Sequence, residues 1–169
     1  TFCFFQEFSA DETFKIHKLQ LGEIFVFPGL SKNSRSTALF VSGEWLPLII
    51  NHCYCQYGGH VCLKLVRYAL VLQCLHLPYH GHATSDLSEV LAQVSSLRSM
   101  TERTLIKKGY GYHILWLGGG DLNQDTRKRN SRSHIISNFL SPCEIVPPAR
   151  PELTTHIHWN TSIESLIDW

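Results

Sequence analysis

The sequence of 169 residues lacks several features that would assign a chain to a class at once. No apolar run reaches the roughly 18 to 20 residues that a membrane-spanning helix needs, and no signal peptide is visible. The formal net charge is only +1, so contact with a polyanion must come from a local patch. There is no internal repeat and no low-complexity tract. We therefore expect one globular domain with a proper core, in an intracellular compartment, the nucleus included, with no membrane partner.

The two ends of the sequence are unusual. The chain begins with Thr1 rather than Met, and strand-like residues reach both ends, as TFCFF at the start and SLIDW at the finish. We expect a piece cut from something longer, or a sequence misassigned at both ends.

The six cysteines do not have the spacing of a secreted disulfide framework. They are Cys3, Cys53, Cys55, Cys62, Cys74 and Cys143. Cys3 and Cys74 lie inside apolar runs, where a free cysteine packs as a small hydrophobic side chain. A reducing compartment is the expectation.

Short β-type runs alternate with turn residues along most of the chain. Strands are expected over residues 2–5, 23–27, 37–41, 46–50, 61–66, 69–77, 112–117, 154–158 and 165–169. A weakly patterned helix is expected over 10–19 and a short one around 130–140. The clearest helix carries an apolar stripe formed by Leu87, Val90, Leu91, Val94 and Leu97, and Gly109 closes that region as a C-cap. Many strands with a few helices between them indicate an α/β or α+β sandwich.

The segment GGGDLN, residues 118–123, combines flexibility with polar chemistry. Glycines at a strand end let the backbone turn sharply and approach a ligand closely. Asp121 would then serve as a base or metal ligand, and Asn123 would hold a phosphate or a water. The alternative is a tight turn in which both side chains cap the backbone.

Three further candidates lie near strand ends. Glu7 follows a strand of aromatic residues, and Mg²⁺ needs only one or two oxygen ligands from a protein. His76 stands near the end of a long apolar strand, where it would contact a phosphoryl oxygen or serve as a structural histidine. Asp168 lies in the last strand, and an aspartate there can orient a histidine. Each of these signals alone also fits an ordinary structural role.

The order of these segments carries more information than any one of them. The chain has QE, a strand ending in HLP, a helix, a strand ending in GGDLN, and a late T-H followed by IDW. This order resembles the endonuclease/exonuclease/phosphatase superfamily, the deoxyribonuclease-I-like group that includes the AP endonucleases. The HLPYHG and ILWLGGGDLN segments look most like the endonuclease domains of non-LTR retrotransposons, where GGDFN is typical. The resemblance runs from Phe4 to Trp169.

The resemblance implies a fold and a chemistry. The fold is a four-layer α/β/β/α sandwich of two packed mixed sheets in a single domain over residues 1–169, with the site at one edge. The activity is phosphodiester hydrolysis of DNA with Mg²⁺ or Mn²⁺, in a domain of retroelement origin that a longer chain would fuse to a reverse transcriptase. Phosphatases and phosphodiesterases that act on lipid or RNA belong to the same superfamily and remain an alternative.

The matching positions imply a role for each candidate. Glu7 would bind the metal, and His76 would contact the scissile phosphate. Asp121 would activate the attacking water, Asn123 would orient the phosphate, and Asp168 would support the catalytic histidine. The basic run after the motif would meet the DNA backbone, or would be a solvated loop; it comprises Arg127, Lys128, Arg129 and Arg132.

The sequence departs from the family pattern in several places. An asparagine motif expected before Thr1 and a Ser-Asp-His motif expected after Trp169 are both absent. Leu166 replaces a common arginine, Tyr79 replaces the asparagine of AP endonucleases, and Leu122 replaces phenylalanine. We therefore expect this chain to cut DNA poorly or not at all, and a chain completed at both ends to cut it with Mg²⁺. A degenerate domain that keeps only the fold is the non-catalytic alternative.

A competing site lies in the middle of the chain. His52, Cys53, Cys55, His60 and Cys62 offer the imidazoles and thiols that zinc prefers. The spacing C-x-C-x₆-C lacks the paired C-x₂-C of common structural zinc sites. Ordinary strand and loop residues are the favoured interpretation, with a zinc-binding module as the alternative.

Overall fold

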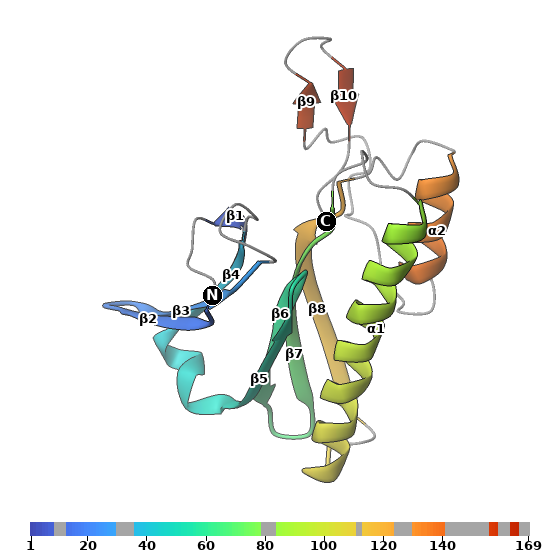
Figure 1. Cartoon of the computed structure of the whole chain (residues 1–169). Helices are drawn as coiled ribbons and strands as arrows, with labels where there is room; N and C mark the ends of the chain where they lie inside the picture. Colours follow the sequence, from blue (N-terminus) through green and yellow to red (C-terminus); the bar gives the residue numbers. More distant parts are fainter. Residues whose placement is uncertain are drawn as a thin grey trace. The chain divides into compact units, whose positions relative to one another are not determined.

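The computed structural model describes residues 1–8, 13–29, 36–78, 84–110, 113–123, 130–140, 156–158 and 163–165. Residue contacts divide the chain into two compact units, and each is considered by itself. The first unit contains Thr1–His76 and Gln93–Gly120, and the second contains Leu77–Ala92 and Asp121–Trp169. Figure 1 labels the elements along the chain.

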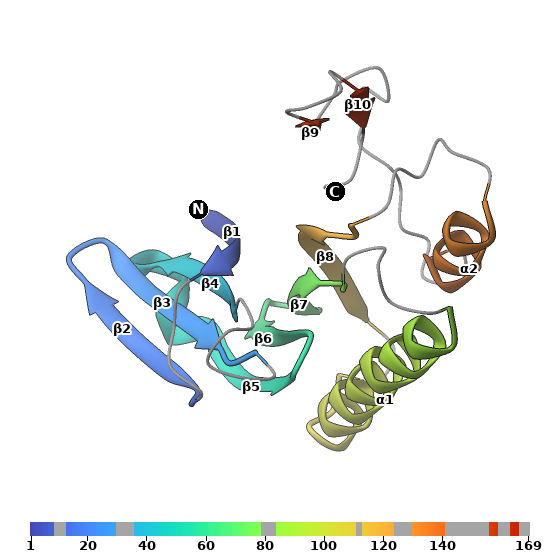
Figure 2. The same cartoon turned by 45° about the horizontal axis from the view of Figure 1, so that its top comes forward.

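The first unit contains two four-stranded sheets. In the first sheet the strand order is β1 (Phe2–Phe8), β4 (Ser36–Ser42), β3 (Gly22–Phe27) and β2 (Lys15–Leu19), with every neighbouring pair antiparallel. In the second sheet the order is β5 (Ile49–Cys55), β6 (Gly58–Lys64), β7 (Ala69–His76) and β8 (Ile114–Asp121). A 3₁₀ helix, η1 (Gly43–Leu48), connects β4 to β5. The two groups of strands can be followed in Figure 2.

Strands β7 and β8 run parallel. The Ala69 N–H donates to the His113 carbonyl at 2.9 Å, and the Leu77 N–H donates to the Asp121 carbonyl at 2.9 Å. Because the offset between donor and acceptor stays at 44 residues, the two strands point the same way. A parallel pair needs a crossover connection, and α1 (Thr84–Lys107) provides it. The second sheet is therefore mixed.

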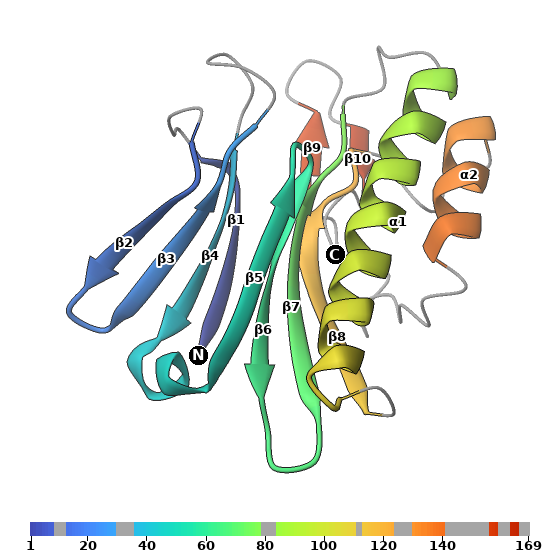
Figure 3. The same ribbon diagram turned by 60° about the horizontal axis from the view of Figure 1, so that its bottom comes forward.

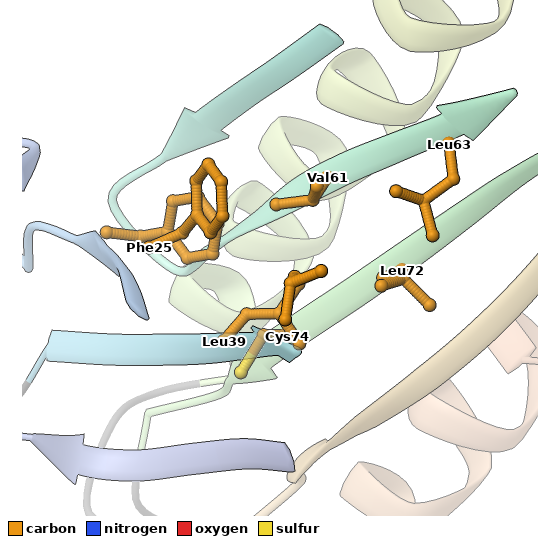
Figure 4. Close-up of a cluster of buried hydrophobic side chains, with 8 residues drawn as sticks. Phe25, Leu39, Val61, Leu63, Leu72 and Cys74 are labelled. Atoms are coloured by element: carbon orange, nitrogen blue, oxygen red, sulfur yellow. The ribbon is translucent and has the colours of Figure 1, made fainter. Parts of the chain in front are cut away.

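The main core lies between the two sheets of the first unit. Phe25, Phe27, Leu39 and Val41 come from the first sheet, and their buried partners from the second sheet are Val61, Leu63, Leu72 and Cys74. Figure 4 shows side chains from both sheets meeting in this cluster. The alternation of inward and outward residues along β6 places its odd-numbered residues on this face. Two packed sheets with few helices confirm the expected α/β sandwich.

The opposite face of the second sheet packs against α1, as Figure 3 shows. Leu105 of α1 lies in a buried cluster with Cys62, Ala69 and Val71. The five residues of the predicted apolar stripe of α1 are all buried, which confirms that prediction. Gly109 has a φ of 90°, and the Tyr110 N–H donates to the Leu105 carbonyl at 2.9 Å. This is the glycine C-cap that the sequence predicts.

The second unit contains α2 (Ser131–Leu140) and a two-stranded antiparallel sheet of β9 (His156–His158) and β10 (Ile163–Ser165). The short helix expected around 130–140 is confirmed, and β9 and β10 overlap the expected late strands. Of the four expected layers, the described residues supply the two sheets and the helical layer on the second sheet. None of the helices in the described part of the chain is long and apolar enough to cross a membrane.

Two predictions of secondary structure were wrong. The helix expected over 10–19 is a strand from Lys15 to Leu19, which pairs with β3 across a turn at Gln20 and Leu21. The hydrogen-bonding edge of β3 outweighs a weak helical pattern there. The strand expected over 46–50 is mostly η1, because Pro47 has no N–H for a sheet ladder. The strand begins at Ile49 and continues to Cys55, beyond the expected end.

Candidate active site

The glycines of the GGGDLN segment lie inside β8 and do not form the sharp turn that the sequence suggests. Among the described glycines, only Gly58 and Gly109 have a positive φ. A Cβ at Gly119 would stand 2.6 Å from the ring of Phe4, and a Cβ at Gly120 would overlap the carbonyl oxygen of Leu75. Glycine is therefore required because β1 and β7 approach β8 closely.

The turn itself comes at Asn123, the last described residue of the motif. Its φ is 50°, a left-handed conformation that asparagine tolerates better than most residues. The Asn123 N–H donates to Oδ1 of Asp121 at 2.6 Å, and its Nδ2 donates to the Leu77 carbonyl at 2.7 Å. Leu122, only 2% exposed, anchors the turn.

Asp121 and Asn123 are thus held together at the end of β8 and against the residue that follows β7. The Leu77 N–H donates to the Asp121 carbonyl, and its own carbonyl accepts from Asn123. Asp121 is only 9% exposed. A buried carboxylate with one oxygen on a backbone N–H is well oriented, and oxygen ligands of this kind suit a hard cation. The structure therefore brings together two of the five predicted catalytic and metal-binding residues.

His76 is the last residue of β7 and is half-buried. Its N–H donates to the Tyr57 carbonyl at 2.9 Å. In the chain it directly precedes Leu77, the residue that bonds to Asp121 and Asn123. His76 and the glycines of the motif belong to the first unit, and Asp121 and Asn123 belong to the second.

Glu7 lies in β1, where the pairing with β4 is irregular between Phe5 and Phe8. Such irregularities re-aim side chains and are common beside active sites. The structure describes the backbone of Glu7 and not its side chain. The neighbouring Gln6 is held in place, since its Nε2 lies 3.5 Å from Sγ of Cys74. Burial raises the pKa of the Cys74 thiol to about 12, so this contact is made by a neutral thiol.

Arg132 differs from the solvated arginine that the basic run suggests. It lies in the first turn of α2 and is 6% exposed. One guanidinium nitrogen, Nη2, donates to the Pro78 carbonyl. Burial lowers the pKa of Arg132 from its ordinary value. Arg127, Lys128, Arg129 and Asp168 lie outside the described residues.

The cysteine and histidine cluster is part of the packing between the second sheet and α1. Thr101 lies at its centre, with its Oγ1 2.9 Å from Sγ of Cys53 and 3.0 Å from Nδ1 of His60. Burial raises the pKa of Cys53, and it raises that of Cys62 to about 12. Protonated thiols are poor zinc ligands. Among the described residues no group of three or more His, Cys, Asp or Glu side chains is placed to hold a metal.

Sequence reasoning missed the backbone of Leu77 and Pro78, which accepts from Asn123 and from Arg132. It also missed the contact between Gln6 and Cys74. The signal for the first was present in HLP, because a proline has no N–H to extend the sheet ladder and so marks the strand end at which these carbonyls lie. No signal in the sequence distinguishes Gln6 from a solvated polar residue.

Comparison with known proteins shows which fold this arrangement belongs to. No protein-family model and no curated protein matches the sequence. The structure is similar to the endonuclease domain of TRAS1, a telomere-specific non-LTR retrotransposon, with a TM-score of 0.52 and 11% sequence identity. The match covers 86% of this chain and 64% of that one. This likeness shows the fold: the chain shares the α/β sandwich of that endonuclease domain and spans somewhat less than two thirds of its length.

Proposed function

We propose that this chain is an endonuclease-like domain of retroelement origin whose chemistry is metal-dependent hydrolysis of phosphodiesters in DNA. The observation that carries the proposal is the fixed pair of Asp121 and Asn123 at the end of β8, in a fold similar to a retrotransposon endonuclease domain. The turn alone does not indicate catalysis, because asparagine and aspartate side chains cap the backbone in many ordinary turns.

The resemblance gives each candidate residue a role in this proposal. Asp121, oriented by the Asn123 N–H, accepts a proton from the attacking water. Asn123 and His76 direct donors toward the phosphoryl oxygens, where negative charge builds up. Glu7 binds the cation, and Asp168 supports a catalytic histidine. Mg²⁺ or Mn²⁺, when bound, neutralises charge on the phosphoryl group.

DNA is the proposed substrate because the basic residues follow the site in the sequence. Arg127, Lys128 and Arg129 supply positive charge for a phosphate backbone. A DNA substrate places the protein in the nucleus, and the retroelement origin makes a fused reverse transcriptase the natural partner in a longer chain. The chain's net charge of +1 does not favour nucleic acid by itself, so this local run has to supply the attraction.

The test compares hydrolysis of supercoiled plasmid, single-stranded RNA and a phosphoinositide in Mg²⁺, Mn²⁺ and EDTA. We expect weak, cation-dependent nicking of the plasmid by this chain, stronger nicking by a chain completed at both ends, and slower hydrolysis of the other two substrates by both. If RNA or the phosphoinositide is hydrolysed faster than the plasmid, that compound and not DNA is the substrate. Retention of hydrolysis in EDTA would contradict the metal-dependent mechanism.

Metal binding separates a working site from a domain that keeps only the fold. Binding of Mn²⁺ can be followed by electron paramagnetic resonance in the wild type and in Glu7→Ala. We expect weak binding that Glu7→Ala abolishes. The matched control is Glu23→Ala in β3, which removes the same charge from the same sheet. Equal losses in both variants would show that Glu7 is not a specific ligand.

A further inference from the structure

Three rings, those of Phe14, His52 and Tyr54, form a stack between the two sheets of the first unit. Phe14 directly precedes β2, and the other two lie in β5; each of these strands is the last in its sheet. The Phe14 ring stacks on the His52 ring at 4.7 Å and 13°, and on the Tyr54 ring at 5.3 Å and 10°. His52 lies opposite the core residue Val61 in register, so this face of β5 is the one that meets the first sheet.

The ring stack is more exposed than rings that only close a core. Tyr54 is 44% exposed and His52 is also exposed, whereas Phe25 and Phe27 beside them are buried. Phe25 meets His52 at a tilt of 51°, and Phe27 meets Tyr54 at 35°, so neither covers a ring face as a stacked ring does. Two exposed rings on a hydrogen-bonded strand offer an apolar surface to a planar ligand.

The two strands that carry the ring stack contain basic residues and no acidic ones. In β2 all five side chains are exposed, and Lys15, His17 and Lys18 are among them. Neither β2 nor β5 contains Asp or Glu. Glu23 of β3 lies opposite Lys18 in register and offsets one of the two lysine charges. Exposed rings next to cations are typical of sites that bind single-stranded nucleic acid, where bases stack and cations meet the backbone.

The ring stack lies toward the same end of the second sheet as His76. Tyr54 is opposite Gly59 of β6, and Gly59 is opposite Cys74 of β7. His76 follows Cys74 by two residues, and its N–H donates to the carbonyl of Tyr57, just beyond β5. Two strand spacings, about 10 Å, therefore separate the strand of Tyr54 from the strand of His76. All of these residues belong to the first unit.

We propose that the ring stack binds an unpaired base of single-stranded DNA, while the lysines of β2 contact the phosphates of the same strand. The inference rests on the proposed function for the identity of the ligand, because a DNA strand bound at His76 reaches the rings by crossing two strands of the sheet. Every base has a π-face, so stacking does not select a base sequence. It selects a single strand over a duplex, in which the bases are already stacked on each other.

The test measures the binding of fluorescein-labelled oligonucleotides by fluorescence anisotropy in EDTA, which prevents metal-dependent cleavage. The ligands have the same length: a DNA strand, the same strand with abasic sites, its duplex, and the RNA strand of the same sequence. We expect the DNA strand to bind most tightly. We expect the abasic strand, which keeps the phosphates and lacks the bases, to bind about 5-fold to 100-fold more weakly.

The variants separate stacking from charge. Tyr54→Ala should weaken binding of the DNA strand about 5-fold to 100-fold and leave the abasic strand unaffected, whereas Tyr54→Phe keeps the ring and should bind as the wild type does. Lys18→Gln should weaken binding of both strands and lower the slope of log affinity against log salt by about 0.7. The matched control is Tyr68→Ala, at a tyrosine 42% exposed whose ring meets His113 edge-on at 5.5 Å, and we expect unchanged affinity.

The inference is wrong if the wild type binds the ordinary and abasic strands equally, or if a folded Tyr54→Ala binds the DNA strand as the wild type does. Urea unfolding midpoints establish which variants are folded; if Tyr54→Ala is not, His52→Ala and the abasic strand decide. Tighter binding of the RNA or of the duplex would overturn the choice of single-stranded DNA. Self-association that Tyr54→Ala abolishes, without any DNA binding, would assign the rings to a second copy of this chain.

Failure of the proposed function gives a different pattern. Plasmid would then not be nicked in Mg²⁺ even by a chain completed at both ends, while the Tyr54-dependent binding of the DNA strand in EDTA would persist. Failure of the inference alone leaves nicking by the completed chain intact and removes the difference between Tyr54→Ala and Tyr68→Ala in binding.

Discussion

His60 lies between β6 and α1 with no exposed surface. Oγ1 of Thr101 lies 3.0 Å from the Leu97 carbonyl oxygen and 3.0 Å from Nδ1 of His60, so Nδ1 has a hydrogen-bond partner. Nε2 is buried and has no partner among the described residues. Burial, with a smaller contribution from Arg98, lowers the pKa of His60 from 6.5 to about 3.

A lowered pKa in the folded state makes stability depend on pH. Well above pH 6.5 the imidazole is neutral whether the chain is folded or unfolded, and its contribution to stability is complete. As the pH falls below 6.5, His60 binds a proton in the unfolded chain but not in the folded chain. The free energy of unfolding therefore decreases, and it continues to decrease down to about pH 3. Between pH 7 and pH 5 the loss amounts to about 2 kcal/mol of the free energy of unfolding.

The perturbation that isolates this effect is His60→Asn, whose amide can donate to Thr101 but does not titrate. Urea unfolding, followed by tryptophan fluorescence at pH 7, 6 and 5, gives the free energy for both proteins. We expect the wild type to lose about 2 kcal/mol more than His60→Asn over this range. If the free energies of unfolding of the two proteins decrease equally between pH 7 and pH 5, His60 is not a buried, neutral histidine.

Two further predictions concern packing. Gly120→Ala should prevent stable folding or cost several kcal/mol, because the new Cβ overlaps the Leu75 carbonyl. Gly43→Ala should be tolerated, because the nearest atom to its new Cβ is 3.6 Å away. Thermal unfolding of both variants measures the difference. Leu105→Ala should cost about 2 to 5 kcal/mol in urea unfolding because it empties the cluster under α1. Ile106→Ala, at a side chain 53% exposed, should cost less than about 0.5 kcal/mol, and equal costs would contradict the assigned faces of α1.

Much of the sandwich could be predicted because period-two and period-3.6 patterns mark buried faces directly. The stripe from Leu87 to Leu97 belongs to a helix, as expected, and the strand expected over 61–66 overlaps β6, which runs from Gly58 to Lys64. The order of the motifs led to the correct fold, which the similarity to the TRAS1 endonuclease domain supports. Patterning failed at Lys15–Leu19, where all five residues are exposed and only pairing with β3 decides the conformation.

The candidate site could be predicted as residue types but not as contacts. The pairing of Asp121 with Asn123 follows from the short polar side chains of the motif. The sequence analysis assigned the glycines to a turn. Glycine is instead required because Phe4 and Leu75, which lie far away in the sequence, approach the strand closely, and no local pattern indicates such contacts. Burial of Arg132 could not be foreseen, because a basic run is normally solvated.

The most direct test of the central claim is plasmid nicking in Mg²⁺ by the wild type and by Asp121→Ala. Each protein is made both as this chain and as an extended chain, completed at its two ends with segments that carry the asparagine and Ser-Asp-His motifs. The account predicts nicking by the extended protein, little or none by this chain alone, and a loss of about 10²-fold to 10⁴-fold in Asp121→Ala. Nicking by Asp121→Ala at the wild-type rate, or none by the extended wild type, would contradict it.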